Sequence, residues 1–352
     1  MVGWPDRRFL DLIGTQHPIV QAPMANAGGV ELCIAAMQAG ALGSLPCAML
    51  SPDQGREQVA QVRGRASGPL NLNFFCHRMP AETDDTAWRA VLKPYYQAFG
   101  LADPPPAPMR LPFDTAMCAV VEEVRPEVVS FHFGLPEHAL LDRVKATGAK
   151  VFGCATTVEE ARWLEDRRVD AIIAQGLEAG GHTGRFLGSD PAEAIGLFAL
   201  LPQVVDAVRV PVIAAGGIAD ARGIAAALTL GASAVQLGTA YLACPESLVP
   251  EGARQVLGSR PTVMTNVYSG GLARATRGRL VDEIGAVRSE APPYPLAGAA
   301  SGPLFRAAME RGDFEFMPML SGQSAPLVQQ LPAADLTRKL AAVALAIIGR
   351  GA

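Results

Sequence analysis

The stretch AIIAQGLEAGGHTG, residues 171–184, decides the fold because it joins a buried strand directly to a glycine-rich loop. Ala171–Gln175 is a short apolar run that ends at a glycine, which is typical of a parallel strand buried on both faces. Gly180 and Gly181 then allow the backbone to approach a ligand closely, and His182 follows them. Parallel α/β proteins bind ligands at the carboxyl ends of their strands, so the sequence predicts a functional site in this loop.

Short apolar runs alternating with helical segments continue on both sides of this loop. The segments between the runs carry helix signals, such as the N-cap residue Ser51 before Pro52. This alternation predicts an α/β fold with a parallel sheet, which right-handed crossovers close most simply into a TIM (β/α)8 barrel. Strands are expected at 18–23, 41–45, 69–75, 128–133, 150–155, 171–175, 211–217 and 234–239, and helices at 30–38, from 52, from 157, and at 190–208, 220–230 and 331–348.

Two long segments depart from this alternation. Residues 77–115 contain a proline cluster and are interpreted as an insertion over the barrel mouth, since long loops in compact domains tend to be functional or mobile. Residues 261–325 are rich in Gly, Pro and Arg and are expected to cap the site. The predicted organisation is therefore a barrel over 1–260 with this insertion, a lid over 261–325, and a C-terminal helix within 326–352 that packs on the barrel. The apolar face of that helix is predicted to be Leu336, Leu340, Val343 and Ile347.

The composition excludes several classes of protein. Of the 352 residues, 49% are apolar and 18% are charged, which favours a large core over disorder. A net charge of −4 without a basic run argues against nucleic acid as a partner. The apolar stretch 341–348 is too short to cross a membrane and the N-terminus lacks a signal peptide's apolar segment, so we expect a cytoplasmic protein. The six cysteines are scattered without a CxxC, which favours reduced thiols and no metal site.

Glycines also follow the last two predicted strands, at Gly216–Gly217 and at Gly238 before Thr239. The corresponding loops of such barrels commonly hold a phosphate through backbone N–H groups, and Gln236 and Thr239 add side-chain hydrogen bonds. The alternative is that these glycines only serve tight turns. Because the chain contains neither GxGxxG after a strand nor a Walker sequence, a phosphate-bearing ligand would be held by the barrel itself.

Six stretches of the chain resemble nitronate monooxygenase, the FMN-dependent family formerly called 2-nitropropane dioxygenase. They are VQAPM at 20–24, NLNFF at 71–75, VSFHFGLP at 129–136, DAIIAQGLEAGGHTG at 170–184, PVIAAGGIADARGIAAAL at 211–228 and AVQLGTAYL at 234–242. The resemblance implies an FMN-binding TIM barrel with a smaller, mainly helical substrate-capping domain. The positions that it implies for contact with the cofactor are Ala22, Pro23, Met24, Asn71, Gln175, Gly180, Gly181, Gly216, Gly217, Gln236, Gly238 and Thr239.

The resemblance also implies a reaction. His182 matches the catalytic histidine of the family. The reaction that this implies is the oxidation of alkyl nitronates by oxygen to carbonyl compounds and nitrite. Neutral nitroalkanes are possible further substrates. Imidazole, with a pKa of about 6.5, suits a general base for the nitroalkane α-proton near neutral pH. With a preformed nitronate, His182 would instead anchor the anion.

Further candidates for the substrate pocket come from their place at the predicted strand ends and in the lid. His132, Phe133 and Tyr294 are expected to line it, with His77 as a weaker candidate, and ordinary packing is the alternative for each. Gly271 stands where many members of the family have an arginine. Arg274 and Arg277 are the nearest candidates to supply that charge.

Other functions fit parts of the same pattern. The main alternative is an FMN-dependent NAD(P)H:quinone or enoyl-thioester reductase, which rapid anaerobic bleaching by NADH would reveal. A flavin-free phosphosugar isomerase or synthase would be colourless, and a flavin-binding sensor would show no response to any substrate. The expected partners are a nitronate or nitroalkane and oxygen, without nucleic acid or membrane, and with a homodimer left open as the assembly.

Overall fold

Eight parallel strands form the core of the computed structural model, which describes residues 3–102, 104–188 and 193–351. The strand order is β1-β9-β8-β6-β5-β4-β3-β2. Two hydrogen bonds bring its ends together, since Gln21 N donates to Leu42 O and Leu42 N donates to Ile19 O, both at 2.9 Å. The predicted α/β barrel is therefore confirmed. Its strands are β1 (Ile19–Gln21), β2 (Gly43–Pro46), β3 (Leu70–Phe75), β4 (Val128–His132), β5 (Lys150–Ala155), β6 (Ala171–Gln175), β8 (Val212–Ala215) and β9 (Ala234–Leu237).

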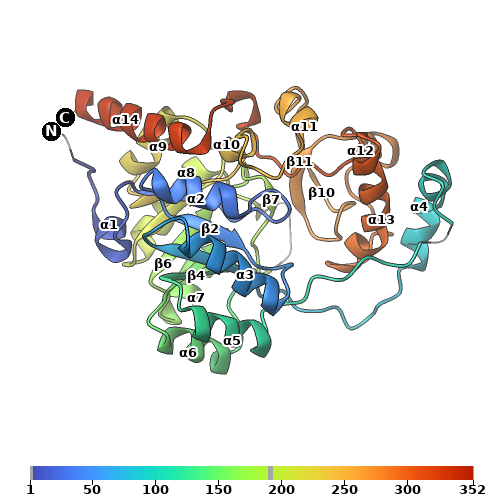
Figure 1. Cartoon of the computed structure of the whole chain (residues 1–352), viewed down its shortest axis with the longest axis horizontal. Coiled ribbons are helices and arrows are strands. Elements are labelled where there is room, and N and C mark those ends of the chain that lie inside the picture. The colour runs from blue at the N-terminus through green and yellow to red at the C-terminus, as the bar shows by residue number, and fades with distance from the viewer. Residues whose placement is uncertain (1–2, 103, 189–192, 352) are drawn as a thin grey trace.

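Helices surround this sheet on its outer side (Figure 1). They follow the strands in turn, and the last helix of the chain packs against α2 and α9, where it occupies the place of an eighth barrel helix. The outer helices are α2 (Val30–Gln38), α3 (Pro52–Arg63), α5 (Thr115–Val124), α6 (His138–Ala146), α7 (Val158–Asp166), α8 (Leu197–Ala207), α9 (Ala221–Thr229) and α14 (Ala333–Gly351), with α1 (Arg8–Ile13) before the barrel and α10 (Thr239–Leu242) after β9.

Local capping chemistry explains where several of these helices begin. Ser51 and Gln54 form a capping box at the start of α3: Gln54 N donates to Ser51 Oγ at 3.2 Å and Ser51 N donates to Gln54 Oε1 at 2.9 Å. The Thr157 hydroxyl accepts from Glu160 N at the start of α7. The Asp220 carboxylate does the same for the first amides of α9.

Two details of the helix predictions are wrong. The helix expected at 190–208 begins only at Leu197, and residues 189–192 lie outside the described part of the chain. The carboxylate of Glu178 accepts the Leu197 N–H, so a loop distant in sequence fixes this start. On α14, Leu336 and Leu340 are buried as predicted, but Val343 is 43% exposed.

A second group of elements, which we call the outer lobe, stands beside the barrel mouth (Figure 1). Its sheet is antiparallel with the strand order β10-β11-β7, and the His182 loop contributes the strand β7. The expectation of a mainly helical region did not include this sheet. The outer lobe comprises α4 (Thr86–Ala98), β7 (Gly181–His182), α11 (Glu251–Gln255), β10 (Thr262–Thr265), β11 (Ala273–Thr276), α12 (Arg279–Ile284) and α13 (Leu296–Glu310), followed by the short turn η2 (Ala325–Leu327).

The segment 77–115 reaches from the barrel to this lobe. Two extended stretches connect α4 to the barrel, and α4 packs on α13 (Figure 1). Trp88 Nε1 donates to Ala297 O at 3.3 Å, and the Tyr96 hydroxyl donates to Ala300 O at 2.8 Å. These side chains belong to an apolar cluster that is separate from the barrel core.

Candidate active site

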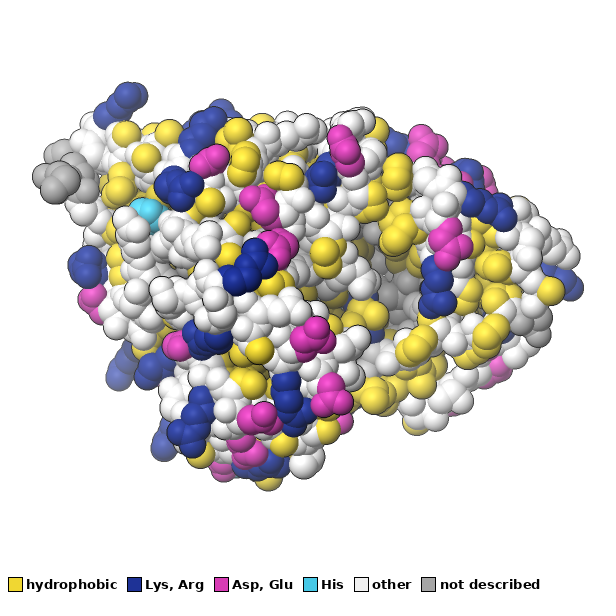
Figure 2. Space-filling view, viewed as in Figure 1, with side chains coloured by type: hydrophobic (Ala, Val, Ile, Leu, Met, Phe, Trp, Pro, Cys, Tyr) yellow, Lys and Arg dark blue, Asp and Glu magenta, His cyan; other side chains and the backbone are white. Residues whose placement is uncertain are grey.

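Most of the predicted cofactor-binding residues lie at the carboxyl ends of the barrel strands, whereas Asn71 is the second residue of β3. Ala22–Met24 follow β1, Gln175 ends β6, Gly216–Gly217 follow β8, and Gly238–Thr239 follow β9. Figure 2 shows that the molecular surface is hollowed between the barrel and the outer lobe, with hydrophobic side chains along the edge of the hollow. The strand ends and the outer lobe therefore face a common space.

Backbone conformation requires glycine at some positions of these loops but not at others. Gly216 and Gly217 have φ values of +111° and +70°, a region that side-chain-bearing residues rarely adopt. A Cβ atom at Gly238 would meet only Ala22 Cβ at 3.6 Å and Met24 Sδ at 3.7 Å, which are ordinary contacts. The packing of the protein itself therefore does not require a glycine at 238.

Two buried amide oxygens on the barrel strands β3 and β9 have no hydrogen-bond partner among the described residues. Asn71 Nδ2 donates to Ser44 Oγ at 2.9 Å, but Asn71 Oδ1 accepts nothing from the described residues. Gln236 Oε1 is also buried and accepts no hydrogen bond from the described residues. Unsatisfied buried acceptors are costly, so these atoms indicate a ligand with N–H or O–H donors. A flavin ring and its ribityl chain carry both kinds of donor, and these residues fit such a group.

At Gly180, unlike at Gly238, the packing of the protein itself requires a glycine. A Cβ atom there would lie 2.5 Å from Gly322 N and from the carbonyl carbon of Ser321, so the backbone of 321–322 packs directly on it. Gly322 N donates to Thr239 Oγ1 at 2.9 Å, and Gln323 N donates to Glu178 O at 2.9 Å. The loop after β9, the loop after β6 and the segment 321–323 thus hold one another in place.

The backbone of His182 is fixed from two sides. His182 pairs with Ala273 of β11 in the outer sheet. Its carbonyl oxygen accepts from His132 Nε2 at 3.2 Å and from Gln175 Nε2 at 3.1 Å, while Gln175 Oε1 accepts from Gly184 N at 2.6 Å. Gln175 and His132 therefore position the histidine loop through its backbone.

The His182 ring lies in an aromatic pocket. Its Nε2 is 2.7 Å from Ser269 Oγ, and the ring is 7% exposed. Its ring centroid lies 5.0 Å from Tyr294, 6.0 Å from Phe133 and 6.3 Å from Phe75. The structure therefore brings the predicted pocket residues Phe133 and Tyr294 to His182.

Burial keeps the histidines of the pocket neutral. Burial is the main cause that lowers the pKa of His182 well below its usual value, and the positive charge of Arg110 adds to it. The pKa of His132 falls to about 4 because the ring is buried, although its bond to the His182 carbonyl works in the opposite direction. Burial also lowers the pKa of His77, whose Nε2 donates to Arg110 O at 3.1 Å.

The sequence did not indicate Ser269 and Arg110 as site residues. Ser269 begins the SGGLAR stretch but has no site signal of its own, and Arg110 lies in a proline-rich segment without periodicity. Arg274 and Arg277, which were expected to supply a charge near the substrate, both have partners of their own. Arg274 donates to Leu177 O and Thr262 Oγ1, and Arg277 pairs with Asp282.

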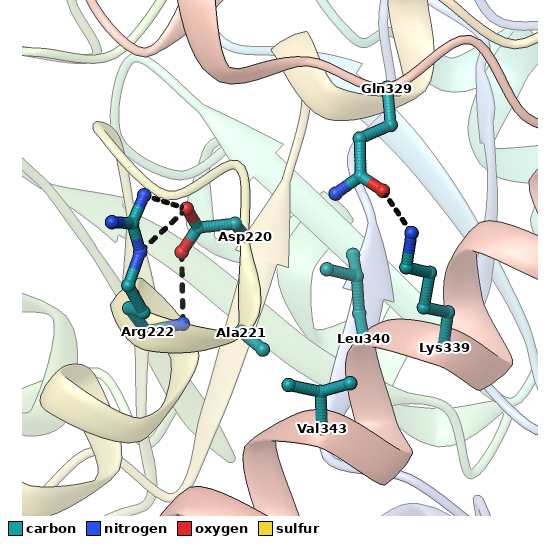
Figure 3. Close-up of a pocket in the computed structure, with 7 residues that line it drawn as sticks. All are labelled: Asp220, Ala221, Arg222, Gln329, Lys339, Leu340 and Val343. Atoms are coloured by element: carbon teal, nitrogen blue, oxygen red, sulfur yellow. Dashed lines mark hydrogen bonds and ion pairs between the residues drawn. The ribbon is translucent and has the colours of Figure 1, made fainter.

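Other parts of the surface offer weaker sites. A cavity of about 180 Å³ lies between the start of α9 and α14 (Figure 3), but Arg222 pairs with Asp220 there and Lys339 donates to Gln329. A cavity of about 240 Å³ is lined by residues of the segments 47–52, 74–75 and 109–117. In the described ranges, no group of three or more His, Cys, Asp or Glu could hold a metal ion, and no helix is long and apolar enough to cross a membrane.

A parallel barrel with a histidine-bearing, glycine-lined mouth defines an enzyme of the TIM-barrel class. A family model described as nitronate monooxygenase matches residues 6–342. A nitronate monooxygenase of Paraburkholderia phytofirmans is 41% identical over 346 residues, which cover 95% of this chain and 94% of the relative. The chain belongs to the nitronate monooxygenase family, whose members are flavin-dependent oxidoreductases.

Solved structures show the same relationship. The nitroalkane oxidase from Streptomyces ansochromogenes is 36% identical, with a TM-score of 0.91 over 98% of this chain and 99% of that one. FabK from Thermotoga maritima is 28% identical, with a TM-score of 0.75 over 97% of each chain. The arrangement of barrel and outer lobe is thus shared with proteins of known structure.

Proposed function

We propose that this protein binds FMN and oxidises alkyl nitronates with oxygen to carbonyl compounds and nitrite. The observation that carries the proposal is the His182 ring, held 2.7 Å from Ser269 Oγ in an aromatic pocket beside the glycine-lined mouth of a nitronate monooxygenase barrel. The family membership supports the reaction class, and the pocket supports a small substrate with an apolar part.

The cofactor proposal rests on the loops at the barrel mouth. Gly216, Gly217, Gly238 and Thr239 would hold the single phosphate of FMN, and Asn71 and Gln236 would accept hydrogen bonds from its ring and ribityl chain. Ala22–Met24, Gln175 and Gly180–Gly181 would line the same site. Bound FMN would supply the redox chemistry, while the chain positions the substrate and excludes water.

His182 would act on the substrate through its second ring nitrogen. The Ser269 hydroxyl lies 3.4 Å from the Gly271 carbonyl oxygen as a donor, so we assign His182 Nε2–H as the donor to Ser269 Oγ. This tautomer leaves Nδ1 as a proton acceptor. His182 would then take the α-proton of a neutral nitroalkane, whereas toward a preformed nitronate it would serve as an anchor.

The outer lobe would serve as the substrate cap. The insertion 77–115 supplies His77 and Arg110 to the pocket, and the segment 261–325 supplies Ser269 and Tyr294. Both segments reach the site from outside the barrel, which supports the division into a barrel over 1–260, a lid over 261–325 and a closing helix within 326–352.

Product analysis tests this function. The purified protein is expected to release FMN rather than FAD on heating and to convert ethyl nitronate into acetaldehyde and nitrite in equal amounts, with oxygen consumed. Nitroethane in place of the nitronate measures whether neutral nitroalkanes are also substrates. A flavin-loaded protein that forms no nitrite from ethyl nitronate would refute the proposal.

A further inference from the structure

We infer that Arg110 is the residue that binds the negatively charged nitronate group of the substrate, with the Tyr294 hydroxyl as a second donor. The inference rests on the proposed function and adds to it the group that recognises the substrate's charge. Neither residue was expected to have this role from the sequence pattern, because Arg110 lies in the proline-rich insertion and Tyr294 in the lid.

The first argument is that both residues present unused donors. Arg110 Nη1 and Tyr294 Oη are buried, and neither has a hydrogen-bond partner of good geometry among the described residues. The guanidinium lies close enough to the Tyr294 hydroxyl to oppose the rise that burial causes in its pKa. No carboxylate in the described part of the chain forms an ion pair with Arg110. Arg110 as a whole is half-buried, but a buried N–H donor of a cation that lacks an acceptor is costly in free energy, so Nη1 is suited to receive an anion.

The second argument is the position of these donors relative to His182. The Tyr294 ring centroid lies 5.0 Å from His182 and 4.7 Å from His77. His77 Nε2 donates to Arg110 O at 3.1 Å and thereby holds the backbone of the arginine. The guanidinium of Arg110 is close enough to influence the pKa of His182, His77 and Tyr294, and it acts on Tyr294 also as a hydrogen-bond donor.

The third argument is chemical fit. A nitronate group is planar, and its two oxygen atoms share the negative charge. A guanidinium offers parallel N–H donors in a plane, which suits two such oxygens. The neighbouring histidines are neutral, so Arg110 is the cation that would balance the substrate. Gly271 borders the same pocket, since a Cβ atom at 271 would lie 3.2 Å from Tyr294 Cβ and 3.4 Å from His182 Cδ2.

The test measures anion binding and turnover on the FMN-loaded protein. Nitrate is a planar oxyanion that does not react, so its dissociation constant is measured by calorimetry, and kcat and KM are measured with ethyl nitronate. Arg110→Met should weaken nitrate binding and raise KM by roughly 10- to 100-fold, with a smaller change in kcat. Arg110→Lys should recover part of the loss, and Tyr294→Phe should weaken nitrate several-fold.

Arg306→Met is the matched control, because Arg306 is an exposed arginine on α13 of the same lobe. An Arg110→Met protein with the nitrate affinity and KM of this control overturns the inference. Loss of FMN with unchanged nitrate binding would assign the guanidinium to the cofactor and would also overturn it. If Arg110→Met does not fold, the other two variants decide. Unchanged nitrate binding in both Arg110→Lys and Tyr294→Phe would overturn the inference. A wild-type protein that binds nitrate through Arg110 but forms no nitrite refutes the proposed function alone.

Discussion

At the scale of single residues, the two proposed tasks of His182 can be separated. Asparagine keeps a polar side chain but does not accept a proton near neutral pH. If Nδ1 is the base, His182→Asn should lower kcat/KM for nitroethane by roughly 10²- to 10⁴-fold. Oxidation of preformed ethyl nitronate, which needs no deprotonation, should fall much less. Equal losses with FMN retained would make His182 an anchor, and no loss with either substrate would remove it from the site.

Gly238 tests the proposed phosphate site. Because a Cβ atom at this position meets only ordinary contacts, Gly238→Val should keep the fold while the added side chain displaces the phosphate. We expect FMN affinity to fall by at least about 10-fold, the scale of a lost charged hydrogen bond. Fluorescence titration with FMN and far-UV circular dichroism measure the two quantities. Unchanged affinity would contradict the assignment.

His132 predicts a pH dependence of stability. Its pKa is about 4 in the folded protein and about 6.5 when unfolded, so the unfolded chain binds more protons between these values. Stability should therefore decrease as the pH falls from 6.5 toward 4, by up to about 3 kcal/mol from this residue. Urea unfolding at pH 7 and pH 5 with saturating FMN measures it. In His132→Gln, which keeps a donor, the loss should be smaller than in the wild type. Equal losses would show that His132 is not the group that titrates.

At the scale of elements, the sequence predicted the barrel strands well because each is a short apolar run bounded by glycine or proline. Strands such as β5 and β6 begin and end at the predicted residues. Helix α8 was less predictable, because Glu178 of another loop fixes its start. The outer sheet was missed for the same reason: β7 has two residues and exists only because β11 pairs with it.

The contact between Gly180 and the segment 321–322 gives a prediction at this scale. Gly180→Ala places a methyl group 2.5 Å from backbone atoms of that segment, so it should displace the segment and destabilise the protein by about 1–3 kcal/mol. Gly238→Ala is the matched control, since its methyl group has room. Thermal unfolding of both variants without added FMN compares them. Equal melting temperatures would show that the packing of 321–322 on Gly180 contributes little.

At the scale of the whole molecule, the resemblance indicated the family and the expected cofactor site, which the barrel strands bring together. It did not indicate the cation near His182. Arg110 reaches the pocket only because α4 anchors the insertion on α13, through contacts such as those of Trp88 and Tyr96. Such tertiary contacts leave no periodic pattern in the sequence, so the place of Arg110 could not be predicted from it, whereas Arg274 and Arg277 are neighbours of Gly271 in the chain.

The central claim is that this barrel uses its flavin to oxidise nitronates. The most direct test is to mix the FMN-loaded protein without oxygen in a stopped-flow instrument, once with ethyl nitronate and once with NADH, and to follow the flavin absorbance. We predict that the nitronate bleaches the flavin rapidly, that oxygen restores the absorbance, and that NADH acts far more slowly. Rapid bleaching by NADH together with no response to the nitronate would contradict the claim and favour a reductase.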